Sequence, residues 1–482
     1  MKALLRWPAI LLSVVSLLDA KEKPANVLIF LADDLGQRDL GSYHPETFYE
    51  TPALDKLAAQ GVRFTQGYAA NPVCSPTRYA LMTGKWPTRV GLTNWLPGIR
   101  NERFMGAPLA HGISAGDTTL AEALKPSGYQ NYFIGKWHLG ENEEDWPEHH
   151  GFDVNIGGFS GGHPKSWFSP YGNPTIKDGE KGEYLTERLA DESIARLSEA
   201  NASGKPFLLC HFFYQVHTPL KGREDLVKKY EAKAERLGLK DQFGTETQFL
   251  LSSKEPRRVR QTQSLPVYAA MVEAMDTAAG RILAALDELG LAENTLVIFS
   301  SDNGGLSTSE GAPTSNLPFR AGKGWVYEGG IREPFIVRWP GVSLAGKTDP
   351  TPVTTLDIFP TALSAAGQTA SGVDGRNLTP LLRGQPFPDR DLYWHYPHYS
   401  NQGGFPGGAI RSGPWKLVEN YEDGSVALYN LDDDSGEKND LSTQEPARTG
   451  EMRQRLHAWY LTTGAKFLGK NGDGPEPWRP AP

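Results

Sequence analysis

Short apolar segments recur along the first three quarters of the chain. They are not interrupted by alternating polar residues, which is typical of strands that are buried on both faces of a parallel sheet. Turn residues such as glycine, proline and asparagine lie around several of them. We predict strands within four segments, 26–34, 129–138, 205–213 and 294–305.

Longer segments between these strands place apolar residues three and four positions apart, the spacing of one helix face. Three of the four end at a glycine, a common helix stop. Strands that alternate with helices predict an α/β domain with a large, mixed, mostly parallel sheet sandwiched by helices. The helix-like segments are 51–61, 118–128, 185–200 and 268–290.

The pattern changes near residue 373, where short strand-like segments are separated by turn residues. A helix-like segment follows at 452–463. We predict a smaller C-terminal α+β subdomain with an antiparallel sheet over 373–482, after a main catalytic α/β domain over 21–372. The helix-like segment 354–367 fits either side of this boundary.

The first twenty residues have a pattern of their own. Lys2 and Arg6 precede a short apolar stretch that ends near Ala20. This pattern predicts a secretory signal peptide over 1–20, because the stretch is too short for a stable membrane span. No cysteine follows it, which argues against a bacterial lipid anchor. We expect a secreted or periplasmic protein without a stable membrane span.

The composition excludes one class of partner. The 482-residue chain has a formal net charge of −8, whereas proteins that bind nucleic acid normally carry a basic surplus. No nucleic-acid partner is therefore expected. The length exceeds that of a single small domain, in agreement with a large domain followed by a smaller one.

Reactive side chains follow each predicted strand. Ligand sites in open α/β sheets lie at the carboxyl ends of the strands, so we expect these side chains to share one rim. Three of them are carboxylates and one offers an amide oxygen, a set that suits Ca²⁺ or Mg²⁺ better than Zn²⁺. Ordinary turns remain an alternative, since Asp and Asn favour turns. The residues are Asp33, Asp34, Lys136, His138, His217, Asp302 and Asn303.

One of the two cysteines lies in an unusual segment, CSPTRYALMTG, which begins at Cys74. Ser75 suits a helix N-cap and Gly84 suits its stop, which predicts a short helix with Cys74 just before its N-terminus. Arg78 adds a positive charge in the first turn. The segment combines a nucleophile with an anion site, although an ordinary capped helix explains it equally well. Cys210 lies in an apolar segment and is expected to be a buried thiol rather than a disulfide partner.

Several cationic side chains could surround a tetrahedral anion through charge-assisted hydrogen bonds. Solvated lysines and hydrogen-bonded core histidines are the alternatives when each residue is considered alone. The candidates are Arg78, Lys136, His138, His217 and Lys323.

The sequence blocks NVLIFLADDLG, CSPTRYALMTG, GKWHLG, HTPL, SDNGG and GKGWVYEGGIREP occur in this order. With them the chain resembles the type I sulfatases, the formylglycine-dependent, arylsulfatase-like members of the alkaline phosphatase superfamily. The C-x-P-x-R signature is intact, and the resemblance covers nearly the whole chain after the predicted signal peptide.

The resemblance implies how these residues are used. A separate maturation enzyme, either formylglycine-generating or anaerobic sulfatase-maturing, would oxidise Cys74 to formylglycine. One Ca²⁺ would be bound by Asp33, Asp34, Asp302, Asn303 and the modified residue 74. The five cationic candidates would surround the sulfate. The hydrated aldehyde would attack sulfur, His217 or a lysine would protonate the leaving oxygen, and His138 would accept the proton as sulfate is expelled.

We expect the substrate to be a sulfate monoester on a carbohydrate, with a sulfated galactose or N-acetylgalactosamine in a polysaccharide or glycosaminoglycan as the preferred class. The residues expected to line the sugar pocket are Trp95, His163, Trp325, Arg332 and Glu333.

Three other functions compete with this interpretation. A phosphonate or phosphodiester hydrolase of the same superfamily would share the modified cysteine. A phosphatase with two zinc ions would need further His and Asp ligands at zinc spacing, which we do not find. A non-catalytic sugar-binding relative would have no need of Cys74.

Overall fold

A computed structural model describes residues 24–247 and 256–480 of the chain. The predicted signal peptide over 1–20 lies outside these residues. No helix in the described part is both long and apolar enough to cross a membrane.

The main sheet confirms the predicted mixed, mostly parallel arrangement. Its nine strands are β1 (Asn26–Ala32), β2 (Val62–Tyr68), β3 (Gln130–Gly135), β4 (Val154–Ile156), β5 (Phe207–Phe212), β8 (Thr295–Ser301), β9 (Arg332–Arg338), β10 (Lys347–Asp349) and β11 (Val353–Thr354). The order is β10-β2-β9-β8-β1-β5-β3-β4, with β11 beside β2. Only β9 runs antiparallel to its neighbours among the described strands of this sheet. The four segments predicted from apolar patterning supply its centre, β8-β1-β5-β3.

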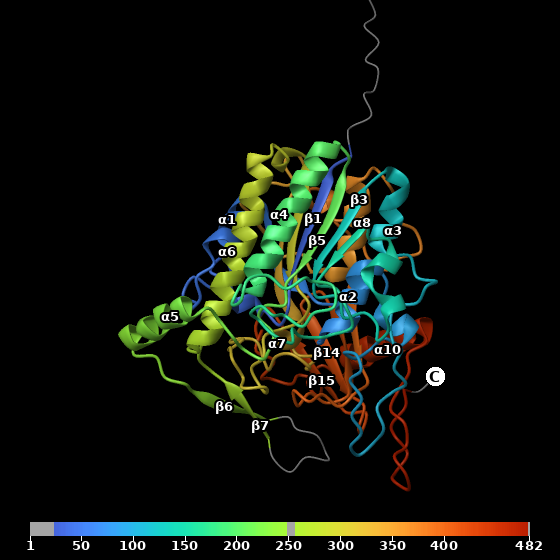
Figure 1. Ribbon diagram of the computed structural model, residues 1–482. Coiled ribbons are helices and arrows are strands. Elements are labelled where there is room, and N and C mark those ends of the chain that lie inside the picture. The colour runs from blue at the N-terminus through green and yellow to red at the C-terminus, as the bar shows by residue number, and fades with distance from the viewer. Residues whose placement is uncertain (1–23, 248–255, 481–482) are drawn as a thin grey trace, which may run out of the picture.

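Helices cover both faces of this sheet (Figure 1). The α-helices of the described chain are α1 (Pro52–Gln60), α2 (Cys74–Thr83), α3 (Leu120–Leu124), α4 (Leu185–Ser203), α5 (Glu224–Leu237), α6 (Pro266–Glu288), α7 (Glu328–Ile331), α8 (Ile358–Ala365), α9 (Thr379–Leu382) and α10 (Pro446–Thr463). Leu28 and Phe30 of β1 share one apolar cluster with α1, α4 and α6. Val27 and Ile29 share another with α2, α3 and α8. Every residue of β1 is buried, which explains its unbroken apolar sequence.

The C-terminal part contains the predicted antiparallel sheet. Its strands pair in the order β12 (Asp391–Tyr396), β13 (Gly407–Ser412), β14 (Trp415–Asn420) and β15 (Val426–Asn430), and α10 packs on β13 and β14. A separate hairpin pairs β6 (Phe243–Glu246) with β7 (Arg257–Arg260). Helix α8, within the segment 354–367, packs in the apolar cluster of the main sheet. The boundary at residue 373 stays a prediction.

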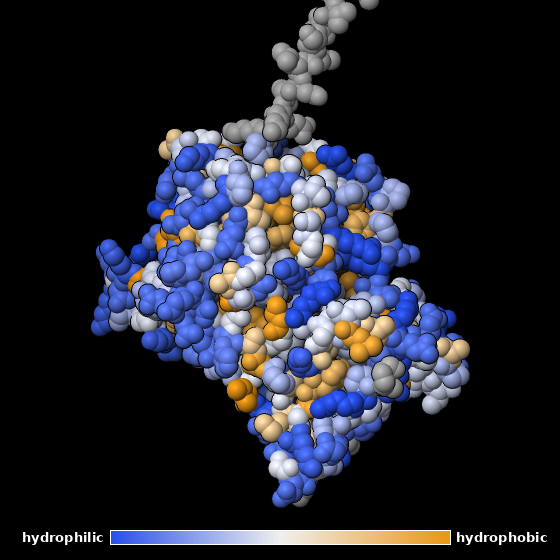
Figure 2. Space-filling view, turned by 90° about the vertical axis from the view of Figure 1, so that its right-hand side faces the viewer, coloured by the Kyte–Doolittle hydropathy of each residue, from blue (hydrophilic) through white to orange (hydrophobic). Residues whose placement is uncertain are grey.

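The surface on the side of α3 and α10 is mostly hydrophilic, as Figure 2 shows. Its orange hydrophobic areas are small and lie between blue ones. The exposed large apolar side chains of the described residues are Ile99, Met105, Leu237, Leu317, Leu344 and Leu461.

Helix α2 differs from the predicted helix at its start. It begins at Cys74 itself, and Val73 is the N-cap residue, without a side-chain capping bond. Ser75 is not the cap, because its hydroxyl oxygen accepts a hydrogen bond from the backbone N–H of Leu96 at 3.2 Å. The helix ends as predicted at Gly84, which has a left-handed φ of 67°.

Substituting Gly84 by alanine is expected to lower the free energy of unfolding by about 2 kcal/mol or more. A left-handed alanine costs about 1–2 kcal/mol, and the new Cβ would lie 3.1 Å from the Phe359 side chain. Gly128 is the matched control, because it also has a positive φ but nothing lies within 4 Å of an added Cβ. Urea unfolding should show a larger loss for G84A than for G128A, and equal losses would contradict the packing argument.

Candidate active site

The predicted rim forms at the carboxyl ends of the central strands. Asp33 and Asp34 follow β1, Lys136 follows β3, and Asp302 follows β8. All four side chains are buried, and the Arg78 guanidinium of α2 lies 2.7 Å from the Asp302 carboxylate and 3.8 Å from that of Asp33. Residues that are more than 200 positions apart in the sequence therefore meet at one place, as the strand ends predicted.

Each buried acid has a cationic partner. Lys136 Nζ lies 2.6 Å from Asp33 Oδ2, and Lys323 Nζ lies 2.6 Å from Asp34 Oδ1. Arg78 donates from Nε to Asp302 Oδ2 at 2.8 Å. Buried charges without partners are costly, so these three pairs are what allows the charged groups to be buried together.

The pKa values of the two adjacent acids differ. Burial raises the pKa of Asp33 well above its usual value, although Lys136 opposes that shift. Burial also acts on Asp34, but Lys323 and His217 outweigh it and hold the pKa of Asp34 below its usual value. Burial therefore disfavours the charged form of Asp33 even beside Lys136, and a bound cation would favour it.

At the ends of β1 and β8, three buried oxygen atoms of this site have no hydrogen-bond partner among the described residues. They are Asp33 Oδ1, Asp34 Oδ2 and Asn303 Oδ1. Unsatisfied buried polar atoms are rare in folded proteins, so such a group indicates a missing ligand. Carboxylate and amide oxygens are the donors that Ca²⁺ and Mg²⁺ prefer, and the residues therefore fit a hard divalent cation.

His217 lies next to these oxygens. Its Nδ1 donates to the carbonyl oxygen of Thr218, and its Nε2 lies 3.7 Å from Asp34 Oδ2. Burial lowers the pKa of His217 well below its usual value, so Nε2 has a lone pair that faces a carboxylate. Ligand atoms of Asp33, Asp34 and His217 lie within 4.8 Å of one another, which adds a possible nitrogen donor to the predicted oxygen set.

Cys74 faces a histidine whose proton position can be assigned. His138 Nε2 lies 2.7 Å from the carbonyl oxygen of Leu96, which can only accept, so Nε2 carries the proton. Burial, together with Lys136, lowers the pKa of His138 well below its usual value. Nδ1 is therefore a free acceptor, and it lies 3.4 Å from Cys74 Sγ.

Neither cysteine forms a disulfide. Cys210 is fully buried in β5, as expected from its apolar segment. Burial raises the pKa of the Cys74 thiol, so the unmodified side chain is held in its protonated form and is a weak nucleophile.

A cavity of about 670 Å³ opens above Cys74. Arg78 and Lys136 are fully buried beneath it rather than in its lining. The ring of His163 stacks on that of His217 with centroids 6.2 Å apart. The predicted site residues that line the cavity are Cys74, Trp95, His138, His163, His217 and Lys323.

Three residues expected in the sugar pocket lie elsewhere. Trp325 is 1% exposed in the apolar cluster shared with the C-terminal sheet. Glu333 is fully buried in β9. Arg332 donates to the carbonyl oxygen of Thr65 and lines a different pocket. After Lys323 the chain passes through α7 and enters β9 at Arg332, so Trp325 and Glu333 are buried in the core.

Other lining residues have no predictive pattern in the sequence. Glu310, Asn401 and Gln402 line the cavity, and the last two come from the C-terminal part of the chain. They lie in loops without a recognisable motif, so only the folded structure brings them to the site.

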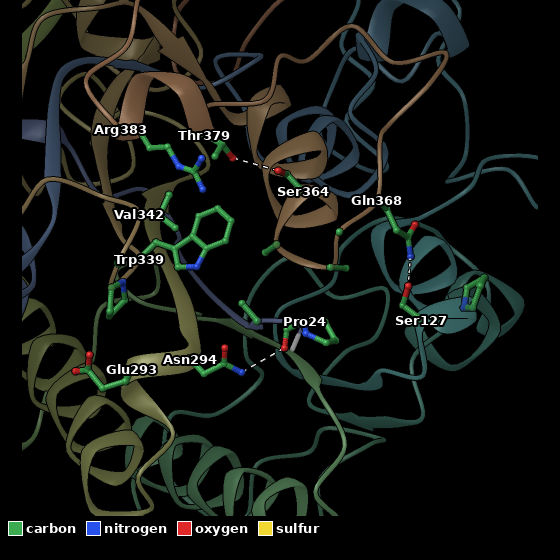
Figure 3. Close-up of a pocket in the computed structure, with 17 residues that line it drawn as sticks. Pro24, Ser127, Glu293, Asn294, Trp339, Val342, Ser364, Gln368, Thr379 and Arg383 are labelled. Carbon is green, nitrogen blue, oxygen red and sulfur yellow. Dashed lines mark hydrogen bonds between the residues drawn. The ribbon is translucent and has the colours of Figure 1, made fainter. Parts of the chain in front are cut away.

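A larger cavity, of about 920 Å³, lies at the other end of the main sheet (Figure 3). Pro24 and Ala25, which precede β1, line it together with Trp339 and Arg383. Asp33 and Asp34 lie at the opposite end of β1, so the length of this strand separates the two cavities. Cys74, His138 and Lys323 line the smaller cavity, whereas Asp33, Asp34, Asp302 and Lys136 are buried outside its lining.

Comparisons with known proteins agree with this geometry. A family model described as Sulfatase matches residues 25–368, and one described as N-sulphoglucosamine sulphohydrolase, C-terminal, matches residues 321–461. A curated sulfatase of Formosa agariphila is 30% identical, over 93% of this chain and 90% of its own. Human N-acetylgalactosamine-6-sulfatase is 34% identical, over 77% of this chain and 68% of its own.

The structural comparison gives the same result. The crystal structure of Ps i-CgsB, also solved in complex with k-i-k-neocarrahexaose, has a TM-score of 0.74 and 27% sequence identity. The match covers 91% of this chain and 93% of that one.

Proposed function

Since the chain belongs to the sulfatase family, whose members are sulfuric ester hydrolases, we propose that it hydrolyses sulfate monoesters of a carbohydrate at Cys74. The observation that carries this proposal is the position of Cys74. Its Sγ lies 3.4 Å from the free Nδ1 of His138, at the base of a cavity that Lys323 lines.

Cys74 would act after conversion to formylglycine by a separate maturation enzyme that supplies the oxidant. The raised pKa of its thiol supports this, because a protonated, buried thiol contributes little as a nucleophile. The hydrated aldehyde would supply a nucleophilic oxygen that the thiol lacks. Nδ1 of His138 is positioned to accept a proton from residue 74, since its Nε2–H is fixed on Leu96.

The cation site would be formed by Asp33, Asp34, Asp302, Asn303 and residue 74, with His217 as a neighbour. The unpartnered oxygens described above support Ca²⁺ over a softer metal. When bound, the cation would neutralise the acids and polarise the sulfate oxygens.

Among the remaining charged groups, Lys323 would bind the sulfate, and the others would position the acids of the cation site. Lys323 reaches the cavity directly, while Arg78 and Lys136 hold Asp302 and Asp33 in place from below. The leaving sugar oxygen would take its proton from Lys323, which lines the cavity, or from Nε2 of His217 after that nitrogen has taken up a proton, because the Nδ1 proton is bonded to Thr218.

The substrate class follows from the relatives and from the cavity. The curated relatives include N-acetylgalactosamine-6-sulfatases, and the solved relative Ps i-CgsB is named in complex with k-i-k-neocarrahexaose. Trp95 and His163 line the cavity and offer ring faces of the kind that contact sugars. We therefore propose a sulfated galactose or N-acetylgalactosamine as the substrate. The enzyme would act on it as a secreted or periplasmic protein.

Paired esters of one leaving group test the proposed reaction. Matured wild-type protein is expected to hydrolyse 4-nitrophenyl sulfate with a kcat/KM at least about ten-fold above that for 4-nitrophenyl phosphate and 4-nitrophenyl phenylphosphonate. Because all three esters release the same 4-nitrophenol, leaving-group ability does not differ between them. The ratio of kcat/KM values therefore reports the preference for sulfur over phosphorus. Faster turnover of either phosphorus ester would favour a phosphonate or phosphodiester hydrolase instead.

A further inference from the structure

One acidic side chain stands out among the residues that line the catalytic cavity. Of the described residues in that lining, Glu310 is the only acid, and it lies near the mouth, where it is exposed to solvent. Its backbone has a positive φ of 52°, in the left-handed region that non-glycine residues seldom adopt. Folding thus fixes a negative charge at the entrance of a site that must bind an anion.

Three side chains of the cavity hold this carboxylate in place. Thr218 donates its hydroxyl to Oε2 at 2.9 Å. Asn401 Nδ2 and Gln402 Nε2 donate to Oε1 at 2.9 and 2.6 Å. Because all three donors also line the cavity, the carboxylate lies within its wall rather than on an unrelated surface.

The hydrogen bonds leave one acceptor position open. A carboxylate has about four lone-pair positions, and three are occupied here, two on Oε1 and one on Oε2. The remaining position on Oε2 can accept a hydrogen bond from a sugar hydroxyl. The same charge repels a second anionic group on the substrate, such as another sulfate or a uronate carboxylate.

We propose that Glu310 is a specificity-determining residue. Its carboxylate accepts a hydrogen bond from a sugar hydroxyl at the cavity mouth, and its charge disfavours substrates that carry a second anionic group there. This inference rests on the proposed function. It narrows the substrate class to saccharides in which a single sulfate enters the site and the part of the sugar that contacts Glu310 is uncharged.

Competition between two sugars tests this inference. The probes are N-acetylgalactosamine 6-sulfate and N-acetylgalactosamine 4,6-disulfate, each used to inhibit the turnover of 4-nitrophenyl sulfate by the matured enzyme. The wild type is expected to bind the monosulfate about ten-fold more tightly than the disulfate. Glu310→Gln is expected to reduce this ratio to about two-fold, because glutamine keeps the size and most of the hydrogen bonds of Glu310 but removes its charge.

Glu293→Gln is the matched control. Glu293 is an exposed acid that lines the cavity at the opposite end of the sheet, so its loss changes the net charge equally at a remote place. This variant should keep the wild-type ratio.

Each result has a defined meaning. An unchanged inhibition ratio in E310Q, with or without a lower kcat, would overturn the inference and leave Glu310 as a residue that only positions Thr218 and its loop. No inhibition of the wild type by either sugar would also overturn it, while the sulfatase activity would stand. No turnover of 4-nitrophenyl sulfate by the matured wild type would instead overturn the proposed function on which the inference rests.

Discussion

Substituting Cys74 by alanine is expected to lower kcat/KM for 4-nitrophenyl sulfate by at least about 10⁴-fold. The variant has no side chain that a maturation enzyme could convert, so the proposed nucleophile is lost, whereas Lys323 still lines the cavity as an anion-binding group. Activity should therefore disappear while sulfate binding remains. Steady-state kinetics would measure the loss of activity, and titration calorimetry with sulfate would measure the binding that remains.

Cys210→Ala provides the matched control for this substitution. Cys210 is also a free, fully buried cysteine, but it lies within β5 and away from the cavity lining. Its loss should cost about 1–2 kcal/mol of stability through the small cavity created, and leave kcat nearly unchanged. If C74A retained activity close to that of C210A, residue 74 would not be the nucleophile.

Removal of divalent cations is expected to abolish turnover and to lower the melting temperature by several degrees. Without a cation, the oxygens of Asp33, Asp34 and Asn303 lie buried and unpartnered. A cation that binds only the folded state adds about 2.7 kcal/mol at 100 times its Kd. Adding Ca²⁺ after treatment with EDTA should restore both activity and melting temperature, as thermal unfolding and kinetics would show.

Asn303→Ala separates the cation site from general effects of EDTA. The substitution removes one of the unpartnered oxygens without leaving a buried charge uncompensated, so the fold should persist. The Ca²⁺ concentration needed for half-maximal stabilisation should rise about ten-fold or more. Asn439, an exposed asparagine, is the control when replaced by alanine. Equal Ca²⁺ dependence in N303A and N439A would contradict the assignment of Asn303.

The strand ends explain why so much of the site is predictable from the sequence. A strand that is buried on both faces is apolar throughout, so a charged residue directly after it marks the rim of the sheet. Three residues lie directly after such strands: Asp33, Lys136 and Asp302. In the structure they form one network of ion pairs with Arg78. The antiparallel C-terminal sheet is predictable for a related reason, since its short strands are separated by turn residues.

Other features depend on contacts that local patterns do not encode. Serine is a residue type that often caps helices, but the Ser75 hydroxyl oxygen accepts a hydrogen bond from the backbone N–H of Leu96. Val73 is the N-cap residue of the helix. Trp325 and Glu333 follow the loop of Lys323, yet they face the core. Glu310 lies in a loop without regular spacing and reaches the cavity only because Thr218 and the segment near residue 402 fold around it.

The mass of the peptide that contains residue 74 tests the central proposal most directly. Protein produced together with a competent maturation enzyme should give this peptide with a mass about 18 Da below that of the cysteine form, because an aldehyde has replaced the thiol. The same peptide from C74A should show no such change. An unmodified thiol at Cys74 under these conditions, in protein that still hydrolyses sulfate esters, would contradict the proposed mechanism.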